Sequence, residues 1–514
     1  MSTHSDLAAG EKSDSKGDGT NVWTETQTAV GTLHPEEPSY YDKSLSYTQE
    51  EENAVIRILD TRLFPAVLLT TFVLNMDRTN LSNAISDGLP ADLGFTINTV
   101  NTATAVYSVV FSLAAFSGAL IAKIVGPSRW IPILMAAWGI VTLSHAAIKN
   151  TAGYFCVRIF IALTEGGVIP SALIYMGGFY KGAELTTRLA WFWGIQSIAN
   201  AVSGLMASGL LQLRGRGGLE GWKWLFLVDG IITMVVSCFI WFYLPRSAVK
   251  TAGASRQIQI AVTRVIRDDE SKQQYEKRVT RADLKDSARD LALWGHLLLT
   301  ALVLTPTQPL GTYLPTVIKS FHFNVFVSNA LTAPPYILQC IAMVLVSWHS
   351  GRTGDRALHG AFGCTGIGKL VGWIILRTMP SSAPRGVKYF GAVIVASWPY
   401  NHPLNVGWMS ENTGSVGKRT IASGAVIFAG NVYGTWASQI YQAQDAPDFR
   451  TGNSINIAFA AAATLMWIIQ RQYYRHLNKV HARKYAALTV EEREEEDSRA
   501  DELGNRSLRF RFRT

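Results

Sequence analysis

Twelve apolar runs, each long enough to cross a bilayer, constrain the fold of this 514-residue chain more than any other feature. A spanning helix needs about 20 predominantly apolar residues. Six runs precede the charged, hydrophilic stretch 246–290, and six follow it. The pattern predicts an all-α membrane protein with twelve transmembrane helices in two six-helix halves. The runs fall at 62–83, 100–122, 130–149, 154–178, 188–211, 222–244, 291–317, 329–349, 359–377, 387–409, 421–442 and 454–471.

The charge content agrees with a membrane protein. Only 17% of the residues are charged and 48% are apolar, whereas a soluble domain averages about 25% charged residues. The net charge is +9, but the basic residues gather between the apolar runs and in the tails, which indicates membrane topology and not nucleic-acid binding. The four cysteines show no CxxC spacing, so we expect no disulfide framework, metal site or cofactor. With no candidate nucleophile either, an enzyme is disfavoured.

The loops predict the orientation and the domain organisation. Most Lys and Arg clusters follow even-numbered spans, on the same side as both tails, and this side should be cytoplasmic. We expect a monomer in the plasma membrane. The predicted parts are a disordered cytoplasmic N-terminal tail 1–58, an N-terminal bundle 59–245, a cytoplasmic central loop 246–290, a C-terminal bundle 291–475 and a cytoplasmic C-terminal tail 476–514.

The apolar stretch from Gly153 to Tyr180 carries two opposite charges, Arg158 and Glu165. Seven residues at about 100° each return to within roughly 20° of the same helix face, about 10 Å further along the axis. Ionisable groups at membrane depth usually face a bundle interior or a wet cavity and mark an ion or substrate path. Glu165 can take up a proton whereas Arg158 cannot lose one, so the pair suits coupling of an organic anion to a proton. The alternative is an ion pair that only fixes helix packing.

A second acid and arginine, Asp77 and Arg78, lie at the end of the first span. Adjacent residues are about 100° apart on a helix, so these two cannot point the same way. One could line a cavity while the other meets a neighbouring helix. The alternative is that both anchor the helix at the membrane interface.

Weaker candidates are polar residues on other spans, which could contact a substrate or bond between helices. Gln196 and Asn200 are four residues apart and share a face. Lys369 could complete an anion site in the second half, although we expect it to extend to the interface. The remaining candidates for substrate binding are Tyr107, Asn412 and Asn431.

Several motifs in order and spacing carry a family resemblance between about residues 55 and 475. They are DRTNLSNA at 77–84, GPSRW at 126–130, RIFIALTEGGVIPS at 158–171, FYKGAELTTRLAWF at 179–192, GWKWLFLVDG at 221–230, WMSENTGSVGKR at 408–419 and DAPDF at 445–449. The chain resembles the major facilitator superfamily, in particular fungal allantoate-permease-like members of its anion:cation symporter branch.

The resemblance implies a secondary transporter of small organic anions, driven by protons and working by alternating access around a midplane site. It implies that Asp77 and Glu165 take protons, and that Arg78 and Arg158 hold the substrate carboxylate, which a planar guanidinium can bind bidentately. It also implies a conformational latch on the cytoplasmic side, although these residues could simply be solvated. The latch residues would be Lys123, Arg129, Arg352, Asp355 and Arg356.

We therefore expect proton-coupled symport of a small carboxylate or ureide, such as an allantoate-like or nicotinate-like nutrient. The alternative is an exporter of a fungal secondary metabolite from a biosynthetic pathway. A sensor that does not transport is disfavoured by the modest tails.

Overall fold

The computed structural model describes residues 40–247, 255–268, 281–399, 402–413, 416–499 and 504–514. All regular elements in these ranges are helical. Nine of the described helical stretches are long and apolar enough to cross a membrane. The predicted spans 188–211, 387–409 and 421–442 fall on helices that are shorter or more polar than that criterion allows.

The first half begins with a helix that precedes the first span. Helix α1 (Gln49–Arg62) starts inside the stretch 1–58, where we expected a disordered tail, because Thr48 and Glu51 form a reciprocal capping box at its start. Helix α6 (Thr151–Glu165) has a simpler cap, in which Asn150 Oδ1 accepts a hydrogen bond from Gly153 N at 2.8 Å. The further helices of this half are α2 (Phe64–Asp87), α3 (Leu89–Asp92), α4 (Ile97–Val125), α5 (Pro127–Ser144), α6 (Thr151–Glu165), α7 (Val168–Gly177), α8 (Gly182–Leu210) and α9 (Gly221–Tyr243).

The second half contains several broken spans. Its seventh span, for example, is divided at Thr305 and Pro306 into α13 and α14. A π-helical segment, His359–Gly366, leads into α17. The helices are α13 (Leu291–Leu304), α14 (Thr307–Ser320), α15 (Val325–Ala330), α16 (Ala333–Thr353), α17 (Ile367–Thr378), α18 (Arg385–Ser397), α19 (His402–Glu411), α20 (Val416–Val432), α21 (Gly434–Ala437), α22 (Arg450–Ala486) and α23 (Val490–Ser498).

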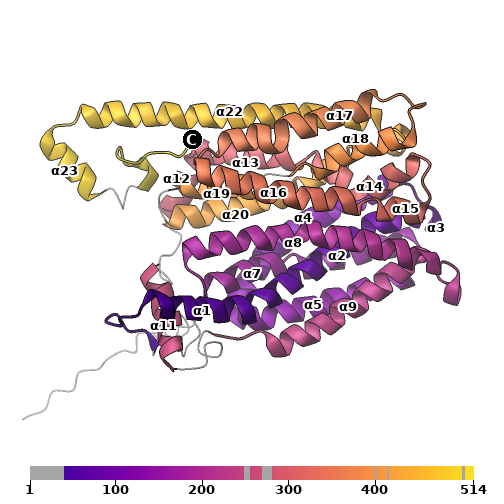
Figure 1. Ribbon diagram of the computed structural model, residues 1–514, viewed down its shortest axis with the longest axis horizontal. Coiled ribbons are helices and arrows are strands. Elements are labelled where there is room, and N and C mark those ends of the chain that lie inside the picture. Colours follow the sequence, from indigo (N-terminus) through magenta and orange to yellow (C-terminus); the bar gives the residue numbers. More distant parts are fainter. Residues whose placement is uncertain (1–39, 248–254, 269–280, 400–401, 414–415, 500–503) are drawn as a thin grey trace, which may run out of the picture.

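The two halves lie side by side, with the later helices, in orange and yellow, along one side of the bundle (Figure 1). Helix α2 packs against α14, α8 packs against α15 and α16, and α4 packs against α20 and α21. We call the end of the bundle that carries α1 and α11 (Ser255–Asp268) the tail end, and the opposite end, which carries α3 and α15, the hairpin end (Figure 1).

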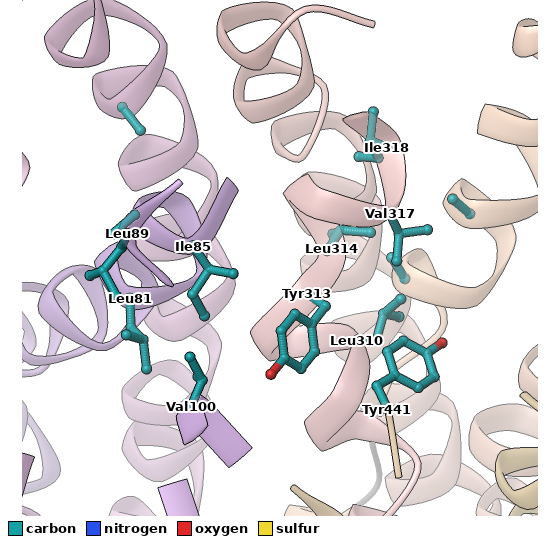
Figure 2. Close-up of a cluster of buried hydrophobic side chains, with 14 of the residues drawn as sticks. Leu81, Ile85, Leu89, Val100, Leu310, Tyr313, Leu314, Val317, Ile318 and Tyr441 are labelled. Carbon is teal, nitrogen blue, oxygen red and sulfur yellow. The ribbon is translucent and has the colours of Figure 1, made fainter. Parts of the chain in front are cut away.

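A buried apolar cluster joins the halves at the hairpin end. It contains Leu81 and Ile85 from α2 together with Leu310 and Tyr313 from α14 (Figure 2). Six hydrogen bonds cross between the halves in the same region. They are Tyr313 Oη to Asn101 Oδ1 at 2.6 Å and to Ile97 O at 3.3 Å, Asn101 Nδ2 to Tyr441 O at 2.5 Å, Ala443 N to Asn98 Oδ1 at 2.8 Å, Lys319 Nζ to Ser86 O at 2.7 Å and Asn329 Nδ2 to Ser86 Oγ at 2.9 Å.

At the tail end, part of the predicted central loop is an ordered helix that packs on the first half. Helix α11 is buried on all sides from Ile260 to Ile266, and Arg264 within this stretch is fully buried. Its Nη1 lies 2.7 Å from Glu184 Oε1 and 3.6 Å from Glu52 Oε1, and its Nη2 donates to Phe179 O at 2.9 Å. The charged composition of 246–290 concealed this helix, because its apolar residues between Ile258 and Ile266 form a run too short to span a membrane. The central segment also includes α12 (Arg281–Arg289).

The last residues of the chain also dock at the tail end, within the predicted C-terminal tail. The buried Phe512 ring stacks on Tyr474 of α22, with ring centroids 5.1 Å apart. Asn478 holds the backbone of Phe512 through two hydrogen bonds of 2.8 and 2.9 Å. Trp408 Nε1 donates to Arg513 O at 2.8 Å. The chain end therefore ties α19 to α22.

Candidate functional site

A cavity of about 360 Å³ lies between the two halves. Its first wall comes mainly from α2, α4, α6, α7 and α8, and its second wall comes mainly from α14, α16, α17, α18, α19, α20 and α21. This volume suits a small molecule. The cross-half hydrogen bonds and the apolar cluster block the cavity on the side of the hairpin end.

Glu165 is the centre of the charged group in the first wall. Its side chain is fully buried, and its Oε2 accepts hydrogen bonds from Arg78 Nε at 3.0 Å and from Tyr107 Oη at 2.8 Å. Glu165 Oε1 is buried without a partner among the described residues. The ion pair thus joins α6 to α2, so the partner of Glu165 is Arg78 and not Arg158 of its own helix. A cation held by one oxygen of a carboxylate can exchange that oxygen for a substrate anion.

Arg158 lies nearby on α6, with only 8% of its surface exposed. Its guanidinium carbon lies over the Tyr107 ring, 4.5 Å from the centroid. This cation–π contact offsets part of the cost of burying the charge. Arg158 Nε is buried without a hydrogen-bond partner among the described residues, and the residue lines the cavity. The site therefore offers a donor for an anionic ligand.

Asp77 faces a different neighbour from Arg78. Its Oδ2 accepts a hydrogen bond from Thr142 Oγ1 of α5 at 3.0 Å, and it is 5% exposed. Asp229 of α9 is fully buried and lies close enough to Asp77 for the two carboxyl groups to interact. Asp77 and Arg78 both line the cavity, so neither serves as an anchor at the membrane interface.

Most of the polar residues predicted for substrate binding reach the cavity. Tyr107, Gln196, Asn200 and Asn431 all line it. Asn200 Oδ1 accepts a hydrogen bond from Thr79 Oγ1 at 2.7 Å, which links α8 to α2. Asn431 Nδ2 donates to Ile427 O of its own helix at 2.7 Å.

Asn412 was wrongly assigned to substrate binding. It follows the last residue of α19 at the tail end and is not among the residues that line the cavity. Its side chain binds the chain end instead, with Nδ2 donating to Arg513 O at 3.1 Å and Oδ1 accepting from Arg513 N at 2.7 Å. The assignment failed because the sequence does not show where the chain end docks.

The predicted latch residues in the second half form tail-end contacts within that half. Asp355 pairs with Arg471 of α22 at 2.5 Å, and Arg356 pairs with Glu411 of α19 at 2.7 Å. Arg352 lies over the Trp348 ring, 5.0 Å from its centroid. In the first half, Arg129 is exposed at the start of α5 and Lys123 lies on α4, with its side chain outside the described residues.

Two basic residues of the second half also line the cavity. Lys369 of α17 is only 4% exposed and is part of the cavity wall, so our expectation that it extends to the interface is wrong. Our sequence reasoning missed His402, whose Nδ1 is buried without a partner among the described residues and whose ring packs edge-on against Trp193. A signal was present, because His402 lies inside the apolar run 387–409.

Comparison with known proteins defines the class. The Major Facilitator Superfamily (MFS) sequence model matches residues 67–469, and the chain belongs to this superfamily. It is therefore a multi-pass membrane transporter and not an enzyme. The bacterial homologue of the human lysosomal transporter Spinster, in its inward-facing, unoccupied conformation, has the same all-helical fold, with a TM-score of 0.64 and 13% identity over 83% of this chain and 98% of that one.

Two relatives in sequence are proteins from fungi. The chain is 29% identical to the Saccharomyces cerevisiae protein named uncharacterized transporter YIL166C, over 92% of this chain and 89% of that protein. It is 27% identical to the MFS-type transporter cnsO of Penicillium expansum, over 89% of this chain and 90% of that protein.

Proposed function

We propose that this MFS transporter carries a small organic anion across a membrane by alternating access. The observation that carries the proposal is the buried Arg158, which lines the cavity beside the Arg78 and Glu165 ion pair with a nitrogen that lacks a partner. Leaving such a cation unpaired in a buried site is costly. A carboxylate that binds Arg158 would remove that cost, and Asn200 and Gln196 would orient the remainder of the molecule.

Proton coupling follows from the contact between Arg78 and Glu165. A substrate anion that takes over the Arg78 guanidinium leaves Glu165 as a buried carboxylate without its cation. Uptake of a proton by Glu165 removes that negative charge, so binding of the anion and of the proton would occur together. Asp77, close to Asp229, is the second candidate proton acceptor.

The relatives favour export of a fungal metabolite over uptake of a nutrient. The relatives reported above are transporters from fungi, and one of them is the MFS-type transporter cnsO of Penicillium expansum. The anionic site serves either direction, since alternating access is reversible and the gradients decide the net flux. Export of an acidic fungal metabolite is therefore the direction we favour, and proton-coupled uptake of a carboxylate or ureide is the second candidate.

The cavity is closed toward the hairpin end, as expected of an inward-facing state if both tails are cytoplasmic. In this state, the contacts of Asp355 and Arg356 would hold the second half together at the tail end. We propose that these contacts rearrange when the tail ends of the two halves approach each other.

Reconstituted vesicles test the proposal. The purified protein is placed in liposomes loaded with labelled carboxylates or ureides, and flux is followed in both directions, with and without a pH gradient. Anion flux that needs the protein and responds to the gradient supports proton-coupled transport of an anion. Flux of neutral solutes alone would contradict the anion assignment. Deletion of the gene in its host, followed by measurement of acidic metabolites inside and outside the cells, distinguishes export from uptake.

A further inference from the structure

The two walls of the cavity both carry basic side chains, although they belong to different halves of the protein. Arg158 and Arg78 lie in the first wall with two carboxyl groups, Glu165 and Asp77. Among the described residues of the second wall, Lys369 alone carries a formal charge at neutral pH. The fold therefore places one basic group opposite a cluster that already contains an anion site.

Lys369 is held in the wall by the packing of its helix. It lies three residues beyond the π-helical segment that ends at Gly366, and such segments are frequent at functional sites. Its neighbour Gly368 lies so close to the Trp398 ring that a Cβ there would be 2.0 Å from the nearest ring atom. This close approach locks α17 against the segment after α18. Lysine is costly at membrane depth and marks a substrate or ion path when it faces a cavity.

We propose that Lys369 is a specificity-determining residue that binds a second acidic group of the substrate, so that the transporter prefers dicarboxylates to monocarboxylates. This inference rests on the proposed function, because it assumes that Arg158 and Arg78 hold the first carboxylate. A dianion that contacts both walls joins the two halves while the cavity is occupied. A monoanion cannot contact the basic groups of both walls at once.

Ligand-induced thermal stabilisation of the purified protein tests the inference without knowledge of the natural substrate. The probes are succinate, glutarate and adipate, each compared with the monocarboxylate of equal chain length: butyrate, valerate and hexanoate. We expect the wild-type protein to bind at least one diacid more tightly than its monoacid. In Lys369→Gln, the affinity for that diacid should fall about tenfold to a hundredfold, to the level of the monoacid, because one charge-assisted hydrogen bond is lost.

Three controls make the result specific. Lys369→Arg keeps the charge and should keep at least part of the preference, whereas Lys149→Gln removes an exposed lysine away from the cavity and should change nothing. Arg158→Gln should weaken both classes of acid. Equal binding of diacids and monoacids by the wild type, or a preference for diacids that survives Lys369→Gln, would overturn this inference but not the proposed function. If the wild type binds neither class, the inference falls together with the anion assignment of the proposed function.

Discussion

Arg78 Nε lies 3.0 Å from Glu165 Oε2, and this contact joins the first span to the fourth inside the transport cavity. The two residues are 87 positions apart in the sequence. Their pairing leaves Arg158, on the same helix as Glu165, available to a ligand. The geometry thus combines a carboxylate that can take up a proton with an arginine that can bind an anion.

Removing the Tyr107 hydroxyl should weaken transport without abolishing it. Tyr107→Phe loses the hydrogen bond to Glu165 but keeps the ring beneath Arg158. The loss of one hydrogen bond from a neutral donor to a charged acceptor should lower the transport rate about tenfold. This rate is measured as the initial rate of anion flux in vesicles. Tyr107→Leu, which also removes the cation–π contact, should be more severe, and equal rates in the two variants would argue against a role for the ring.

The hydroxyl of Tyr313 should stabilise the conformation closed at the hairpin end. It donates to Asn101 Oδ1 of the other half, which in turn binds Tyr441 O. In Tyr313→Phe, a cysteine introduced at Gly311 in the cavity should react several-fold faster with a bulky thiol reagent added from the hairpin side. The matched control is Tyr389→Phe, whose hydroxyl donates to Leu331 O within the same half. Similar acceleration in both variants would contradict a specific role of the cross-half bond.

Close packing of α4 against the break between α6 and α7 should make Gly118 sensitive to substitution. A Cβ at Gly118 would lie 2.4 Å from Gly167 Cα, and that atom is backbone and cannot move aside. Gly118→Ala should lower the melting temperature, since overpacking typically costs about 1–3 kcal/mol. Gly177→Ala, where a Cβ meets nothing within 4 Å, is the control and should be neutral.

The chain end should contribute to the stability of the second half. Phe512→Ala removes a buried ring that stacks on Tyr474, and such substitutions cost about 3 kcal/mol in a well-packed core and less at its edge. We expect a lower melting temperature and faster proteolysis of the tail. Arg511→Ala changes an exposed side chain and serves as the control. Unchanged proteolysis in Phe512→Ala would show that the docked tail contributes little.

The all-helical MFS fold could be predicted from the sequence. In lipid, each span must satisfy its own backbone hydrogen bonds, so a long apolar run that crosses the membrane is a helix. The helix α11 in the central segment could not be predicted, since it packs in the apolar cluster of the first half and pairs through Arg264 with residues far along the chain. The docking of the chain end could not be predicted either, because it also depends on contacts with residues distant in the sequence.

The residues of the candidate site were partly accessible to sequence reasoning. Charges inside apolar runs are rare, so Asp77, Arg78, Arg158 and Glu165 stand out, and the structure brings all four to one cavity. The spacing of residues predicts which face of a helix they share, but it does not predict which other helix packs against that face. For that reason the sequence did not show that Glu165 pairs with Arg78 of another helix.

The most direct test of the central claim is anion flux in vesicles that contain the wild type, Glu165→Gln or Arg158→Ala, each confirmed as folded by its melting curve. Transport should fall by about tenfold or more in Arg158→Ala, because the anion loses a charge-assisted partner. Glu165→Gln should retain anion exchange but lose its response to a pH gradient. Wild-type flux with an intact pH response in both variants would contradict the assignment of anion binding and proton coupling to this site.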